Sequence, residues 1–279
     1  MRKAISITLF IVLYLSITSI FGQKTDLEKA DLNGKVKSVR ETVYSIPKSP
    51  KGNPVLEIII DNIHHYNELG NKTKSYYHKG DTLFSYSICN YNDRNELSTI
   101  NEYNSDGSNY LIINFASDDK GIIVSANYNR KSQKAYDDER KSIDIEYDKY
   151  YQQLFTRVIF KNDFKGYVIE ATYLTANNKL AYRYTYKYDY KYHLVETKFY
   201  NNSGKVSWRK TMKYNSDGNL KASKYFESNR IAQTSTYDLE SDQYSNWINC
   251  KESRVLHDNF FADGLNDNTI ITVRKIEYY

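Results

Sequence analysis

The chain has 279 residues, a formal net charge of +5 and 26% charged residues, and its 29 Tyr contrast with only 3 Pro and 2 Cys. Lys and Arg alternate with Asp and Glu along the chain and form no basic cluster, which argues against a nucleic-acid partner. Two Cys are too few for a zinc site of four thiolates, and the sequence indicates no cofactor.

The N-terminus has the layout of a secretory signal peptide. Met1–Lys3 is positively charged, Ala4–Ile20 is mostly apolar, and polar sequence follows Gly22. We expect residues 1–22 to be removed and residues 23–279 to form one domain that is secreted, periplasmic or attached to the cell envelope. A retained anchor helix is the alternative, but about 17 residues is short for a hydrocarbon layer of about 30 Å. We expect no transmembrane span after cleavage.

A short pattern recurs along the chain: a Tyr, then Asn or Asp, a polar turn, and a run of alternating apolar and polar residues. The Asn or Asp side chain can close the turn, and the Gly that often follows supplies a positive φ. One such unit is a strand plus a turn, so the chain is predicted to be a series of β-hairpins. Copies begin at Tyr66, Tyr91, Tyr103, Tyr188, Tyr200, Tyr214 and Tyr237.

The pattern predicts about sixteen strands in all. Two stretches interrupt it: 129–141, which is dense in charge and is interpreted as an insertion, and the irregular loop 255–268. Open sheets rarely exceed about ten strands. We therefore expect an all-β antiparallel meander that coils as a curved sheet, partial barrel or spiral, with its aromatic face inside. In chain order, the clearest predicted strands are 35–44, 55–60, 72–78, 82–90, 122–128, 143–147, 154–160, 166–173, 180–188, 193–200, 206–214, 220–226, 231–237 and 269–279.

One face of these strands is expected to be aromatic. In Leu180–Tyr188 the Tyr residues alternate with Arg, Thr and Lys, so the two kinds of residue point to opposite faces. Val206–Tyr214 repeats this alternation, except that Lys210 falls on the aromatic face. Exposed aromatic rings can stack on sugars or anchor a protein partner. The alternative is that they line the interior of the sheet. The candidate binding aromatics are Tyr182, Tyr184, Tyr186, Trp208 and Trp247.

No catalytic or metal-binding constellation is evident in the sequence. His64 and His65 are neighbours in a predicted strand, so they point to opposite faces and are poorly placed to share a metal ion. Residues 137–139 are acidic and are interpreted as a solvated loop, and residues 263–268 lack the spacing of a calcium loop. Cys89 and Cys250 either form one disulfide in an exported protein or remain two buried free thiols.

The pattern Tyr-Asp/Asn-x-x-Gly-Asn, followed by an alternating strand, resembles the YD repeat of the Rhs family. The C-terminal stretch from Tyr237 to Tyr279 resembles that of secreted YD-repeat-like proteins of the Bacteroidetes type. This resemblance implies a spiral β-hairpin fold and export, without implying toxin delivery. The copies that carry it are Tyr66–Asn71, Tyr91–Leu97, Tyr103–Ser108, Tyr200–Val206 and Tyr214–Leu220.

The sequence specifies no reaction. We expect an exported, non-enzymatic β-repeat protein that acts as a binding or scaffold module at the cell envelope or outside it, with an unidentified protein or glycan partner. One alternative is a carbohydrate-binding or glycan-active protein that uses exposed aromatic rows. A second alternative, suggested by the Rhs-like pattern alone, is an immunity or partner protein of a toxin system.

Overall fold

The computed structural model describes residues 25–30, 32–46, 56–130, 155–257 and 269–279. These residues form sixteen antiparallel strands and one short helix. Within this part of the chain, no helix is long and apolar enough to cross a membrane. The helix is α2 (Asp26–Lys29). The first eight strands are β1 (Val36–Ile46), β2 (Glu57–Tyr66), β3 (Lys72–Lys79), β4 (Thr82–Tyr91), β5 (Leu97–Asn104), β6 (Asn109–Ser117), β7 (Ile123–Arg130) and β8 (Arg157–Asn162). The others are β9 (Val168–Leu174), β10 (Leu180–Tyr188), β11 (Leu194–Tyr200), β12 (Val206–Tyr214), β13 (Leu220–Glu227), β14 (Arg230–Ser241), β15 (Trp247–Leu256) and β16 (Thr269–Tyr278).

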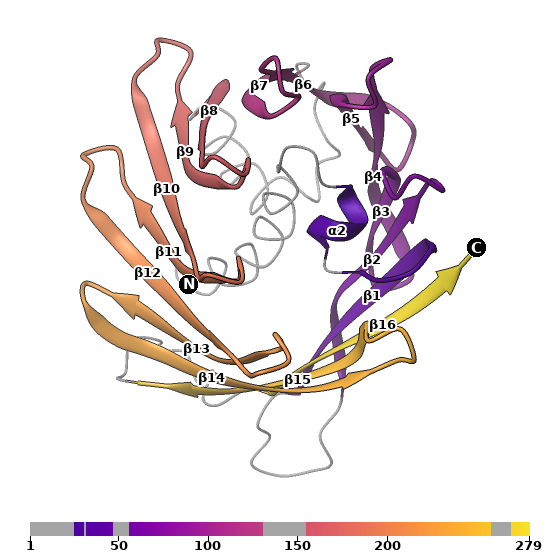
Figure 1. Cartoon of the computed structure of the whole chain (residues 1–279), viewed down its shortest axis with the longest axis vertical. Coiled ribbons are helices and arrows are strands. Elements are labelled where there is room, and N and C mark those ends of the chain that lie inside the picture. Colours follow the sequence, from indigo (N-terminus) through magenta and orange to yellow (C-terminus); the bar gives the residue numbers. More distant parts are fainter. Residues whose placement is uncertain (1–24, 31, 47–55, 131–154, 258–268) are drawn as a thin grey trace, which may run out of the picture.

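The sheet closes into a barrel. The strands follow one another around the ring in chain order, and β1 pairs with β16 (Figure 1). The predicted all-β antiparallel meander is therefore confirmed, but the predicted curled or spiral sheet is wrong. Closure pairs the two strands that would otherwise be open edges, and so satisfies backbone groups that an edge leaves exposed.

The turns at one end of the barrel share one design, and the turn at 163–167 illustrates it. The Asp163 backbone N–H donates to the Tyr167 carbonyl at 2.8 Å, and Asp163 Oδ1 accepts from the backbone N–H groups of Lys165 and Tyr167 at 2.9 Å each. Gly166 has a φ of 87°, which favours glycine. The same turn begins at Asn67, Asn92, Asp118, Asp189, Asn215 and Asp242.

A Tyr directly before the turn fastens neighbouring strands. The Tyr188 hydroxyl donates to the Val168 carbonyl at 3.0 Å, and the Tyr214 hydroxyl donates to the Leu194 carbonyl at 2.9 Å. Each bond joins the end of one strand to the start of the strand before it. At Tyr188 and Tyr214 the Tyr-Asp/Asn pair is therefore a structural device, in which Tyr ties two strands and Asp or Asn closes the turn. The turn predicted to begin at Tyr237 is wrong, because Tyr237 lies within β14 and the turn begins at Asp242.

The position of α2 identifies the inner face of the barrel. This helix lies inside the ring of strands, and its Leu27 belongs to the same buried cluster as Val39 of β1 (Figure 1). Residues paired directly across two strands point to the same face of the sheet, so the inward direction of Val39 identifies the inward residues of every other strand. The largest apolar cluster also lies on this face. Its buried members are Leu111, Ile113, Ile123, Ala126, Phe155, Val158, Phe160, Val168, Ala171, Tyr173, Ala181, Tyr182, Tyr184 and Trp208.

Several expectations fall on residues outside the described part of the chain. Residues 1–22, the predicted strand 143–147 and the acidic stretches 137–139 and 263–268 lie there. Of the predicted insertion at 129–141, the structure describes only Asn129 and Arg130, which end β7.

Asn246 fastens the closed barrel at the end that holds the Asp and Asn turns, such as the turn at 163–167. Its side chain is fully buried, at 0% exposure. Its Oδ1 accepts the Asn33 N–H at 2.6 Å, and its Nδ2 donates to the Asn33 carbonyl at 2.9 Å and to the Tyr278 hydroxyl at 2.8 Å. One side chain therefore joins the segment before β1, the turn before β15 and the end of β16.

The substitution Asn246→Ala should lower the free energy of unfolding by about 2–4 kcal/mol, because it leaves the buried N–H and carbonyl of Asn33 without partners. Urea unfolding followed by circular dichroism measures this loss. Asn219→Ala is the matched control, since Asn219 holds the same position in its turn and closes that turn with its backbone carbonyl. Equal losses in the two variants would contradict this role of Asn246.

Candidate functional site

The inner wall contains an aromatic sector, made of Tyr173, Tyr182, Tyr184, Phe199 and Trp208. The rings contact one another in series: Tyr173 and Tyr182 have centroids 4.3 Å apart at 25°, and Phe199 and Trp208 have centroids 5.8 Å apart at 14°. Tyr184 bridges the two pairs through edge contacts. Such packing comes from register, because Tyr182 lies directly opposite Tyr173 and Phe199 opposite Trp208.

All five candidate binding aromatics face the inside of the barrel. Tyr182, Tyr184 and Trp208 are buried in the aromatic sector. Tyr186 is half-buried beside Tyr184, and Trp247 lies under the Arg274 guanidinium, whose carbon is 3.4 Å from the ring centroid. These five rings therefore line the interior of the sheet, which was the alternative to an exposed binding row, and none of the five points outward.

A second part of the inner wall is a charged sector, made of Glu41, Lys210, Glu252, Arg254 and Arg274. Arg254 Nη2 lies 2.8 Å from Glu252 Oε2, and Arg274 Nε lies 2.9 Å from Glu41 Oε2. Both pairs are well buried, with side chains between 9% and 14% exposed. The Lys210 that breaks the pattern of its strand belongs to this sector. The other four residues carried no sequence signal, because single charges are common in strands.

Electrostatics keeps Glu252 ionised. Burial raises the pKa of its carboxyl, but the hydrogen bond and charge of Arg254, together with the charge of Lys210, outweigh burial and lower the pKa. Burial lowers the pKa of Lys210, and the charge of Glu252 opposes that shift. The sector formally holds three cations and two carboxylates.

Two donors of the charged sector are buried without a hydrogen-bond partner. These donors are Arg254 Nε and Arg274 Nη1, which have no partner among the residues that the structure describes. Most buried polar groups are paired, so an unpaired one calls for an explanation. An acceptor from a bound molecule would satisfy either group.

The adjacent histidines point to opposite faces. His64 faces inward, with Nδ1 2.8 Å from Ser75 Oγ, and burial holds its pKa well below the usual value. His65 faces outward against the edge of Tyr76. Among the residues that the structure describes, no group of three or more His, Cys, Asp or Glu could hold a metal ion.

The outer face carries a row of Tyr76, Tyr86 and Tyr103 that the sequence analysis missed. The three residues lie directly opposite one another in β3, β4 and β5, a register that sequence spacing does not reveal. Tyr86 and Tyr103 stack at 4.9 Å and 9°, and Lys74 Nζ lies 4.6 Å from the Tyr76 centroid and 5.0 Å from that of Tyr86. These contacts join three neighbouring strands, so the row helps to hold the sheet together.

Cys89 and Cys250 are free thiols on distant strands. Between β4, which holds Cys89, and β15, which holds Cys250, lie β3, β2, β1 and β16. Paired strands are about 4.8 Å apart, whereas a disulfide requires Cα atoms within about 7 Å. The structure therefore favours the free-thiol alternative, and burial raises the pKa of Cys250 to about 12.

Neither a protein-family model nor a curated protein matches the chain. Among solved structures, the chain is similar to a porin-like protein from Bacteroides uniformis, with a TM-score of 0.54 and 13% identity over 88% of this chain and 98% of that chain. A porin-like protein from Bacteroides vulgatus matches with a TM-score of 0.40 and 11% identity over the same shares, 88% and 98%. The first similarity shows the fold alone, and the second is too low to support an inference.

The resemblance to YD-repeat proteins of the Rhs family is wrong. Sixteen strands of the described chain close through the pairing of β1 with β16, and the similarity to the porin-like protein covers 88% of this chain. The misleading signal was the Tyr-Asp/Asn turn. It is a local solution for joining two antiparallel strands, so it recurs in a barrel as well as in a spiral.

The substitution Glu252→Gln should lower the free energy of unfolding by about 1–3 kcal/mol at pH 7, because it removes a charge-assisted bond from Arg254. The pKa of Glu252 is lowered on folding, so its contribution is present above the unfolded value of about 4.3 and is lost as the pH falls through the folded value. The difference between the variant and the unchanged protein should therefore shrink below about pH 4.

Urea unfolding of both proteins across this pH range makes the comparison. Glu240→Gln is the control, since Glu240 lies on the exposed outer face of β14. A difference for Glu252→Gln that is constant with pH would contradict the assignment.

Proposed function

We propose that this chain is a non-enzymatic binding protein of the cell envelope, whose barrel holds an amphipathic molecule against its inner wall. One observation carries the proposal: the inner wall joins an aromatic sector to a charged sector, while the outer faces of β1 to β3 and β8 to β16 carry charged residues. The expected signal peptide supports export, and the barrel fold is compatible with an envelope protein.

The outer wall supports a barrel whose sides lie in water. Glu196 is the centre of an outer cluster, 3.3 Å from Lys187 Nζ and 3.4 Å from Lys198 Nζ. A barrel that spans a bilayer presents an outward apolar band about 25 Å tall, and Lys or Arg at its midplane costs about 2–4 kcal/mol. Charged residues on the outer face of β1 to β3 and β8 to β16 include Arg40, Asp61, Lys74, Arg157, Glu170, Arg183, Glu196, Arg209, Lys224, Asp238, Lys251 and Lys275.

The chemistry of the inner wall indicates the kind of ligand. The aromatic sector makes this part of the inner wall apolar, which suits a hydrocarbon body better than a polar one. The charged sector has one more cation than carboxylates and two unpaired Arg donors, which favours an anionic head. A long-chain fatty acid combines both features and serves as a probe of this ligand class.

The two other functions expected from the sequence have less support. The carbohydrate hypothesis was based on outward rows of Tyr182, Tyr184, Tyr186, Trp208 and Trp247, and all five side chains point into the barrel. A toxin-immunity role rested on the Rhs-like pattern alone, which the fold does not share.

Myristate should bind the full chain saturably, and Lys210→Met should weaken this binding about five- to tenfold, or about 1 kcal/mol, because it removes a cation from the charged sector. Myristyl alcohol has the same chain without the carboxylate, so its affinity should not change. Isothermal titration calorimetry with both probes measures the effect.

Lys224→Met is the matched control, because Lys224 is exposed on the outer face of β13. Absence of saturable myristate binding to the unchanged protein would refute the proposal. An equal loss of affinity in both variants would refute the role of the charged sector.

A further inference from the structure

Two neighbouring turns at one end of the barrel expose aromatic side chains at their tips. Phe164 lies in the turn between β8 and β9, and Tyr190 lies in the turn between β10 and β11. Each is 87% exposed, the highest value for a large hydrophobic residue in the described part of the chain. Exposed aromatics gathered at one place indicate an interaction surface.

The two turns are locked together. Tyr167 of the first turn stacks on Tyr192 of the second, with centroids 4.5 Å apart at 28°, and Lys165 Nζ lies 4.0 Å above the Tyr192 ring. The tips therefore form one preformed unit, so that ordering them on a partner costs little entropy.

Tyr192 adopts a backbone conformation that is unusual for an aromatic residue. Its φ is 67°, at a turn position that Gly166 and Gly218 fill in neighbouring turns. A bulky residue in the left-handed region is disfavoured, and such residues gather at functional sites. Here the conformation places the Tyr192 ring against Tyr167 and under Lys165.

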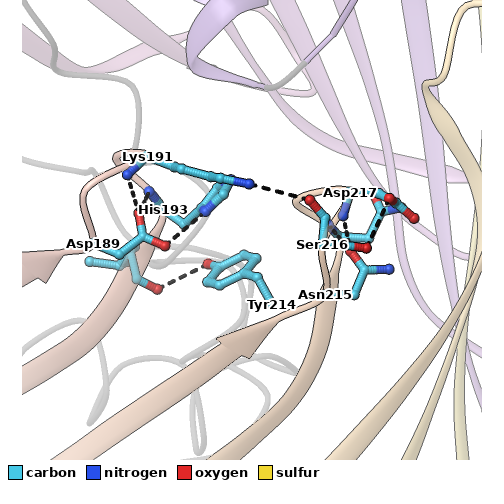
Figure 2. A network of polar contacts seen from close by, with 9 residues as sticks. Asp189, Lys191, His193, Tyr214, Asn215, Ser216 and Asp217 are labelled. Carbon is cyan, nitrogen blue, oxygen red and sulfur yellow. Dashed lines mark hydrogen bonds and ion pairs between the residues drawn. The ribbon is translucent and has the colours of Figure 1, made fainter.

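The second turn is also held by its own hydrogen bonds and by contacts with β12 and the turn that follows β12 (Figure 2). The Asp189 carboxylate accepts the backbone N–H groups of Lys191 and His193 at 2.9 Å each, and His193 Nδ1 lies 2.9 Å from Asp189 Oδ2. The His193 ring stacks on Tyr214 at 4.7 Å and 20°, and Lys191 Nζ donates to the Ser216 carbonyl at 3.3 Å. The turn is therefore held against the next turn along the rim.

A Lys follows each exposed aromatic residue. Lys165 follows Phe164 and Lys191 follows Tyr190, and both Lys side chains are exposed. The carboxylates of the same turns, such as that of Asp189, accept the hydrogen bonds of their own turns. Acidic residues occur in the turns on either side, at Asp118, Asp119 and Asp217. Each aromatic turn thus places an exposed Lys at its tip and its Asp at its base, while the turns on either side carry a net negative charge.

We propose that these two turns dock the barrel onto the surface of a lipid bilayer that contains anionic lipids. Aromatic side chains favour the interface between headgroups and hydrocarbon, and Lys beside them pairs with anionic headgroups. Protruding tips fit a bilayer, which yields to inserted side chains, better than they fit a sugar or a peptide. Phe164 has no polar atom, so it suits hydrocarbon. This surface is independent of ligand binding on the inner wall.

Sedimentation with vesicles of phosphatidylcholine and phosphatidylglycerol tests the docking surface. The double variant Phe164→Ala/Tyr190→Ala should lose at least about tenfold in vesicle affinity, because it removes the inserted apolar area. Phe84→Ala is the matched control and should bind as the unchanged chain does. Phe84 is 55% exposed in β4, at the start of the strand and away from this end. Every protein in the comparison begins at Gln23, the expected start of the exported chain, so any difference in vesicle binding reports the turns.

A second measurement uses Trp fluorescence to test whether the tip at position 164 enters the bilayer. The emission of Phe164→Trp should shift to the blue on mixing with these vesicles, while that of Phe84→Trp should not shift. Lys165→Gln/Lys191→Gln should weaken binding to the anionic vesicles and leave binding to pure phosphatidylcholine unchanged. Equal vesicle affinity of the double alanine variant and its control, or a Phe164→Trp emission unaffected by vesicles, would overturn the proposal. Binding of the tips to a glycan or a protein in place of vesicles would overturn it too.

Discussion

The pairing of β1 with β16 is the constraint on which the rest of the structure depends. It converts a long meander, which would expose an edge at each end, into a ring with an inner and an outer face. Asn246 secures this seam from the turn before β15, by bonding to Asn33 ahead of β1 and to Tyr278 at the end of β16. Every assignment of a side chain to one face follows from this closure.

Closure gives the two faces different chemistry. The inner face brings the aromatic sector and the charged sector into one enclosure, whereas the outer face distributes ion pairs such as Arg183 with Glu170. A barrel immersed in lipid needs the opposite arrangement, apolar outside. The similarity to a porin-like protein therefore concerns the path of the chain alone, and the charged residues of the outer face are the basis for the proposal that the sides of the barrel lie in water.

The turns link architecture to the proposed docking surface. Their common design holds Asp or Asn at the first position and places the second and third residues at the tip, where the residue type varies from turn to turn. In most of these turns the fourth position is Gly, Asn or Ser, and at Tyr192 it is aromatic. Phe164 and Tyr190 occupy the second position of their turns, at the tip. The turns therefore share one backbone structure but expose different side chains.

The sequence by itself determined the antiparallel meander and most of its turns, because alternation and Asp or Asn turns are local properties of a few residues. It also pointed to Lys210, whose charge interrupts an aromatic face. Only the tertiary structure decided that the sheet closes, because this depends on the pairing of residues more than 230 positions apart, such as Glu41 with Arg274. Cross-strand register likewise decided which aromatic rings meet inside the barrel, and strand order decided which turns are neighbours at the rim.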